Sequence, residues 1–88
     1  MRILVIEDEV RLAATLQDLL ELNGYAADVR HDGEAGLDDA LTGIYDVILL
    51  DVMLPKLDGF TVLRRLREAG NAVPVLMLTA RSELSDRV

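Results

Sequence analysis

The chain has 88 residues, enough for one small domain, and 51% of them are hydrophobic while only 3% are aromatic. This composition predicts a folded domain with an aliphatic core and argues against a disordered chain. The net charge of −7 disfavours nucleic-acid binding by this segment alone, but it leaves a cationic ligand or a basic partner open. The lack of cysteine excludes disulfides and thiolate metal sites, and the single histidine, His31, excludes a multi-histidine zinc site in one chain.

The chain begins with a short apolar run at residues 3–6, which predicts a strand buried on both faces. Three acids follow it directly: Glu7, Asp8 and Glu9. A run this short that is closed by acids is neither a signal peptide nor a membrane span, so we expect a cytoplasmic protein without a membrane partner.

A helix is predicted next, because apolar residues recur at helical spacing at Leu12, Leu16, Leu19 and Leu20. Gly24 suits the left-handed conformation that ends such a helix. Residues 25–30 alternate between apolar and polar, which is typical of a strand nearer a sheet edge. Residues 31–33 predict a turn, and residues 34–42 predict a short helix with one apolar side formed by Leu37, Ala40 and Leu41.

The most informative segment is the third predicted strand, residues 46–51, in which four consecutive apolar residues end in a carboxylate, Asp51. A loop containing Pro55 follows, and Asp58 is the expected cap of the next helix. In open α/β sheets, ligands bind where buried strands emerge into loops at their carboxyl ends. Asp51 is therefore the first candidate functional residue.

The third predicted helix covers residues 59–69, with Phe60, Leu63 and Leu66 expected to face inward. Three arginines point outward, and a favourable interaction with the helix dipole explains them better than a phosphate site: Arg64, Arg65 and Arg67. Residues 75–79 predict a fourth, continuously apolar strand, and another helix is predicted from residue 80.

Strict alternation of strands and helices predicts a parallel α/β sheet with helices on both faces. In such a sheet all strand carboxyl ends lie at one edge. That edge would carry Glu7 and Asp8 from the first strand, Asp51 from the third and the Thr79 hydroxyl from the fourth. If the first and third strands are neighbours, the carboxylates converge and require a cation, and oxygen ligands favour Mg²⁺ before Ca²⁺ or Mn²⁺.

Such a site has both a chemical and a structural explanation. A carboxylate beside Mg²⁺ can act as a nucleophile toward phosphorus and form an aspartyl phosphate. The acids could instead serve only the helix dipole, and a lone threonine could be an ordinary strand-end hydroxyl. The combination of acids after the first and third strands with a hydroxyl after the fourth favours the chemical explanation.

Three segments together resemble the receiver domains of two-component response regulators: ILVIEDE, VILLDVMLPKLDGF and PVLMLTAR. The resemblance runs over essentially the whole chain and is strongest to the OmpR/PhoB-type transcriptional group. It implies a flavodoxin-like α/β fold with a parallel sheet. It also implies a regulatory protein, not a conventional enzyme, that receives a phosphoryl group from the histidine of a sensor kinase and acts on a transcriptional output domain.

By the same resemblance Asp51 is the phosphoacceptor. Asp8 would bind Mg²⁺ directly, Glu7 through water, and the Met53 carbonyl would be a further ligand. Thr79 would be the switch hydroxyl that turns toward the phosphoryl group. Lys56 does not occupy the position of the family's essential lysine and is given no such role.

The resemblance stops at the start of the fourth helix, so we expect residues 1–88 to form a truncated receiver domain that lacks strand 5 and helix 5. The essential lysine, the aromatic switch residue and the DNA-binding domain of the family then have no counterpart. Strand 4 would present an apolar edge, and we expect this edge to drive dimerisation or exchange of elements between two chains.

Alternative functions follow from the same residues. The chain could be a fragment impaired in phosphorylation that acts only as a folding or self-association module. A nucleotide or flavin binder is disfavoured, because acids and not a glycine-rich phosphate loop follow the first strand. An aspartyl phosphatase is disfavoured, because residues 52–54 contain no second acid.

Overall fold

The computed structural model describes residues 1–78, in which four strands alternate with three helices. The strands are β1 (Arg2–Ile6), β2 (Ala26–Arg30), β3 (Val47–Asp51) and β4 (Val75–Leu78), and the helices are α1 (Val10–Leu22), α2 (Gly33–Ala40) and α3 (Gly59–Glu68). The predicted alternation is therefore confirmed through β4. Thr79 and the helix predicted from residue 80 lie outside the described residues.

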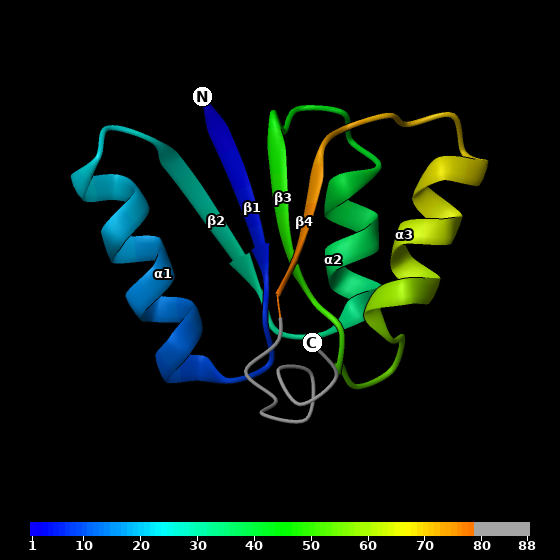
Figure 1. Cartoon of the computed structure of the whole chain (residues 1–88), viewed down its shortest axis with the longest axis horizontal. Coiled ribbons are helices and arrows are strands. Elements are labelled where there is room, and N and C mark those ends of the chain that lie inside the picture. The colour runs from blue at the N-terminus through cyan, green and yellow to red at the C-terminus, as the bar shows by residue number, and fades with distance from the viewer. Residues whose placement is uncertain (79–88) are drawn as a thin grey trace, which may run out of the picture.

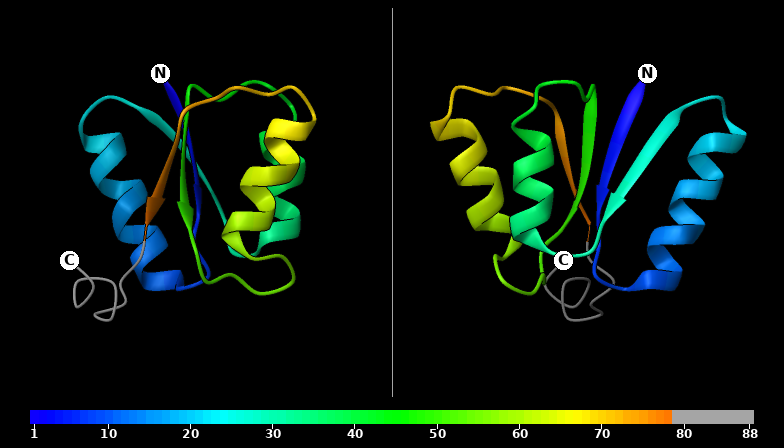
Figure 2. Two further views of the ribbon diagram at one scale, coloured as in Figure 1. Left: turned by 45° about the vertical axis from the view of Figure 1, so that its right-hand side comes forward. Right: turned by 180° about the vertical axis from the view of Figure 1, so that it is seen from behind.

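The strands form one parallel sheet in the order β2-β1-β3-β4. Thus β1 and β3 are neighbours, and their register pairs Ile6 with Leu50. Because of this pairing, the residues that follow both strands leave the sheet at the same edge. α1 lies on one side of the sheet, and α2 and α3 lie on the other (Figure 1). Seen from behind, α2 and α3 run side by side (Figure 2).

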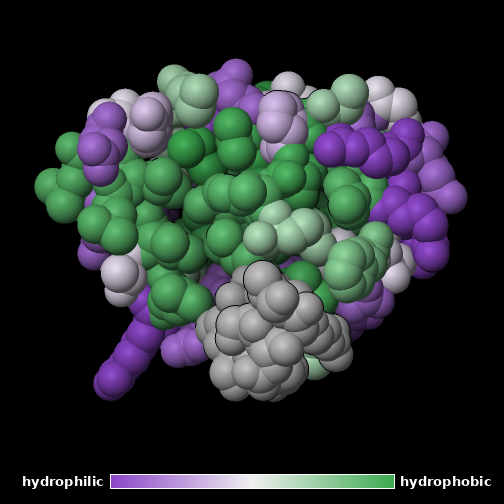
Figure 3. Space-filling view, viewed as in Figure 1, coloured by the Kyte–Doolittle hydropathy of each residue, from purple (hydrophilic) through white to green (hydrophobic). Residues whose placement is uncertain are grey.

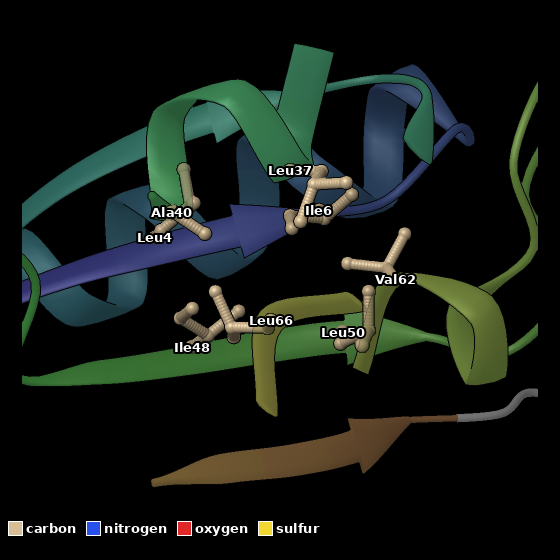
Figure 4. Packing of buried hydrophobic residues seen from close by; sticks show 8 residues of the cluster. All are labelled: Leu4, Ile6, Leu37, Ala40, Ile48, Leu50, Val62 and Leu66. Carbon is tan, nitrogen blue, oxygen red and sulfur yellow. The ribbon is translucent and has the colours of Figure 1, made fainter. Parts of the chain in front are cut away.

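The main core lies between the sheet and the α2–α3 side. Successive residues of a strand point to opposite faces, so alternate residues of β1 and β3 meet the apolar faces of the two helices (Figure 4). The buried cluster consists of Leu4, Ile6, Leu37, Ala40, Ile48, Leu50, Val62 and Leu66. In α3 the prediction for Phe60 was wrong: its side chain is exposed, because Val62 and Leu66 occupy the face that contacts the sheet.

The opposite side of the sheet is less completely covered. Only Ala13 of α1 is fully buried, and Leu19 remains half exposed although it belongs to the predicted apolar stripe. In β4, the strand at one edge of the sheet, Leu76 is 59% exposed. Apolar side chains gather over the middle of the surface seen in Figure 3. Among residues 1–78, no strand pairs with the outer edge of β4.

Side-chain caps fix the starts of α2 and α3. The Asp58 carboxylate accepts a hydrogen bond from the Thr61 backbone N–H at 3.0 Å, which confirms the predicted cap. Asp32 caps α2 in the same way by accepting from Ala35 N–H at 2.8 Å, whereas the sequence predicted only a turn there. These caps set where the two loops beside the acidic edge end.

No helix within residues 1–78 is long and apolar enough to cross a membrane.

Candidate metal centre at the edge of the sheet

Three carboxylates meet where β1 and β3 end. Asp51 is the last residue of β3, while Glu7 and Asp8 directly follow β1. One carboxylate oxygen of each residue lies within 4.8 Å of those of the other two. Glu7 and Asp51 are buried, with 5% and 8% of their surface exposed, whereas Asp8 is exposed. Among these three residues of the described part of the chain, Asp8 is thus the one that solvent reaches most readily.

Within residues 1–78, no ion pair compensates the negative charge of this cluster. Burial, and then repulsion by the Asp51 carboxylate, raise the pKa of Glu7 from 4.5 to about 7, although a hydrogen bond from the Glu9 backbone opposes the rise. Neither of the two ion pairs found within residues 1–78 involves these acids; they join Arg2 to Asp28 and Arg30 to Asp39. The possible ligands are hard carboxylate oxygens, two of them on buried residues. They fit a divalent cation such as Mg²⁺.

The loop between β3 and α3 is pressed tightly against Asp51. Gly59 N–H donates to the Val52 carbonyl at 2.9 Å. A β-carbon added at Gly59 would lie 2.2 Å from the Asp51 carbonyl oxygen, closer than any side chain can come. Glycine at this position therefore lets α3 begin directly against the backbone of Asp51.

A second glycine joins the same loop to the start of α2. Gly33 N–H donates to the Pro55 carbonyl at 3.2 Å, and a β-carbon at Gly33 would overlap the Leu57 carbonyl. Lys56, between these two loop residues, adopts a left-handed φ of 68°, a conformation that the sequence did not predict. The loops that surround the acids are therefore held against one another by backbone contacts.

Of the other residues predicted for the site, Met53 lies in the loop two positions beyond Asp51. Its backbone N–H donates to Asp51 Oδ1 at 3.4 Å, a long hydrogen bond. Thr79 falls outside the described residues, so its relation to the cluster stays a prediction. One contact was missed by sequence reasoning altogether: His31 Nδ1 lies 3.0 Å from the Glu7 carbonyl oxygen.

The sequence is similar to proteins of one known family. Residues 3–88 match the profile of the response regulator receiver domain. The chain is 51% identical over its whole length to the transcriptional regulatory protein DltR of Streptococcus agalactiae, of which it covers 39%. It is 48% identical over 87 residues, 99% of this chain, to the transcriptional regulatory protein PcoR of Escherichia coli, of which it covers 38%.

Solved structures of receiver domains also have this fold. The receiver domain of the Francisella response regulator 1452 aligns with 98% of this chain and 73% of its own, with a TM-score of 0.85 and 33% identity. The response regulator TrrA from Thermotoga maritima, solved with Mg²⁺-BeF, aligns with 99% of this chain and 76% of its own, at a TM-score of 0.86 and 31% identity. The receiver domain of the sensor histidine kinase PA1611 from Pseudomonas aeruginosa has magnesium coordinated in its active-site cleft; it aligns with 98% of this chain and 72% of its own, at a TM-score of 0.86 and 35% identity.

The chain therefore belongs to the response regulator receiver domain family, with the flavodoxin-like fold that the sequence predicted. Its relatives are OmpR/PhoB-type transcriptional regulators of two-component systems. The chain spans about two fifths of the length of the curated relatives it matches. The family is a regulatory one.

Proposed function

We propose that this chain is the phosphoacceptor part of a cytoplasmic two-component response regulator. In this proposal Asp51 receives a phosphoryl group from the histidine of a sensor kinase, and the phosphorylated form regulates a transcriptional output domain. The observation that carries the proposal is the buried carboxylate of Asp51 beside two further acids at one edge of a receiver-type sheet.

The acids would hold Mg²⁺ together, with Glu7, Asp8 and Asp51 as ligand residues and the Met53 carbonyl as a further ligand. When bound, Mg²⁺ neutralises negative charge on a phosphoryl group and so permits its approach to the acids. The main support for Mg²⁺ binding is the set of three carboxylates itself. Among them, the buried Glu7 has a pKa that is raised by burial and by Asp51. Magnesium in the cleft of the PA1611 receiver domain is a second support.

Transfer to Asp51 needs little from the protein except position. An oxygen of the Asp51 carboxylate forms a bond to phosphorus while the bond from phosphorus to the kinase imidazole nitrogen breaks. The β3–α3 loop, fixed by Gly59, keeps the carboxylate at the crevice, and the Met53 N–H faces one of its oxygens. Thr79 would hydrogen-bond a phosphoryl oxygen of the product.

The alternative is a truncated receiver that binds Mg²⁺ but accepts no phosphoryl group. It is supported by coverage, since the chain aligns with only 73% of the Francisella receiver domain and with 76% of TrrA. The remaining part of those chains would include strand 5, helix 5 and the family's essential lysine.

Incubation with Mg²⁺ and a small acyl-phosphate donor separates these possibilities. We expect intact-mass spectrometry to show one added phosphoryl group on the wild-type chain and none on Asp51→Asn, because an amide is not a nucleophile toward phosphorus. Asp38→Asn, an exposed acid of α2, is the matched control and should be labelled like the wild type. Persistent labelling of Asp51→Asn would contradict the assignment. Mg²⁺ binding without any labelling of the wild type would favour the alternative.

We further propose that the uncovered side of β4 associates with a second copy of the chain. The support is the unpaired outer edge of β4 among the described residues, together with the 59% exposure of Leu76. We expect sedimentation velocity to show dimers whose fraction rises with concentration. Leu76→Lys should shift them to monomers, because the charge disfavours edge pairing.

Leu22→Lys supplies the matched control for this experiment, because Leu22 is 82% exposed on α1, away from β4. It makes the same chemical change and should leave association unaffected. A wild-type chain that stays folded and monomeric at high concentration would contradict the proposed self-association.

A further inference from the structure

The hydrogen bonding between β1 and β2 changes character at its carboxyl end. The last backbone link joins Glu7 N–H to the Arg30 carbonyl at 2.9 Å. In a continuing parallel pair, the Glu7 carbonyl would next accept from the backbone two residues beyond Arg30. That residue, Asp32, is instead the cap of α2, and the imidazole of His31 lies against the Glu7 carbonyl, with Nδ1 at 3.0 Å.

The chemistry of this contact defines one tautomer. A carbonyl oxygen can only accept a hydrogen bond, so Nδ1 of His31 must carry the proton. The imidazole N–H thus takes the place of the backbone N–H that would form the next β1–β2 hydrogen bond. Because the contact bridges 24 positions in the sequence, it joins the loop before α2 to the loop before α1.

The Glu7 carbonyl is not an arbitrary acceptor. It shares one planar peptide unit with the nitrogen of Asp8, so its direction determines how the chain passes from one acid to the next. The Glu7 backbone N–H donates to the Arg30 carbonyl, and the Glu7 carbonyl accepts from His31. Asp8, by contrast, is exposed, and its position depends on this peptide.

We propose that His31 is a positioning residue for the acidic site. Its Nδ1–H fixes the Glu7 carbonyl and thereby holds the carboxylates of Glu7 and Asp8 in the arrangement that binds a divalent cation. The cation part of this inference rests on the proposed function. The hydrogen bond itself exists independently of any cation, and this separation makes the two claims testable apart.

Three substitutions at His31 separate a positioning role from a merely structural one. In His31→Asn the side-chain amide can place an N–H near the position of Nδ1, whereas in His31→Gln it lies near the position of Nε2. His31→Ala has no donor. We expect Mg²⁺ affinity, measured by calorimetry on the full chain, to fall about tenfold in His31→Ala and His31→Gln. His31→Asn should restore most of it.

The metal-free protein provides the second measurement. Nitrogen NMR of the His31 ring should show the Nδ1–H tautomer, and the Asp8 amide signal should move in His31→Ala and His31→Gln but much less in His31→Asn. An Nε2–H tautomer, an unmoved Asp8 amide, or equal Mg²⁺ affinity in all variants would each overturn the positioning role.

Mg²⁺ affinity and the NMR signals test the two claims separately. If the wild-type chain binds no Mg²⁺, the proposed function is contradicted, while the ring and amide signals still decide whether His31 holds the Glu7 peptide. If Mg²⁺ binds equally well to every variant, the positioning role is wrong and the proposed function stands. Urea unfolding of each variant shows whether a loss of affinity instead reflects loss of the fold, which would also contradict positioning.

Discussion

Gly59→Ala is expected to destabilise the protein by about 3 kcal/mol or more, because the new methyl group cannot fit behind Asp51. Its carbon would lie 2.2 Å from the Asp51 carbonyl oxygen and 2.9 Å from Val52 Cα, and both are backbone atoms that cannot rotate away. α3 would have to move off the end of β3 and would displace the β3–α3 loop with it. Urea unfolding measures the loss of stability.

Gly43→Ala is the control for this change. Gly43 has a left-handed φ of 79°, so alanine there is strained, but no atom beyond the adjacent residues lies within 4 Å of the new carbon. We expect a loss of only about 1–2 kcal/mol, from the backbone conformation alone. Equal losses for the two variants would show that the close approach at Gly59 is not a constraint on the site.

Glu7→Gln is expected to have opposite effects on stability and on cation binding. In the metal-free protein the pKa of Glu7 is raised from 4.5 to about 7, so the folded state binds the proton more tightly than the unfolded state does. The contribution of Glu7 to the free energy of unfolding therefore falls as the pH rises from about 4.5 to 7, and the loss is complete above that range.

Glutamine removes this pH-dependent penalty. At pH 8 without Mg²⁺ we expect Glu7→Gln to be more stable than the wild type by on the order of 3 kcal/mol, since the pKa rises from 4.5 to about 7 and one pKa unit corresponds to about 1.4 kcal/mol. At pH 4 the two proteins should differ little. Mg²⁺ should reverse the order at pH 8, because the wild type gains stability from binding and the variant has lost a charged ligand residue.

Thermal unfolding at both pH values, with and without Mg²⁺, tests this prediction. Glu34→Gln is the matched control, because it removes an exposed acid from the first turn of α2 and should give no stabilisation at pH 8. A Glu7→Gln variant that follows the wild type at every pH would mean that the acidic cluster carries no uncompensated charge.

Much of this fold could be predicted because its signals are local. Continuous apolar runs define parallel strands, and the Asp58 cap is a property of a few adjacent residues. The convergence of Glu7 and Asp51 also follows from topology, since parallel strands end at one edge and β1 and β3 are neighbours. Here a single assumption, strand adjacency, was sufficient.

The features that were missed depend on how the elements meet in space. The face of α3 was misjudged at Phe60, because two adjacent apolar stripes compete and only packing against the sheet selects Val62 and Leu66. The contact of His31 with the Glu7 carbonyl links loops 24 positions apart, and no spacing pattern indicates it. The need for Gly59 arises from the closeness of α3 to Asp51, which only the packed structure shows.

The central claim is that Asp51, and no other acid of the cluster, accepts the phosphoryl group. The most direct test is to treat the wild-type chain with Mg²⁺ and an acyl-phosphate donor, reduce it with borohydride, and map the peptides by mass spectrometry. Reduction converts an aspartyl phosphate to homoserine and so marks the acceptor permanently. We expect homoserine at position 51 alone, and only when Mg²⁺ is present. Homoserine at Asp8 or Asp58, or a phosphoryl group retained on His31, would contradict it.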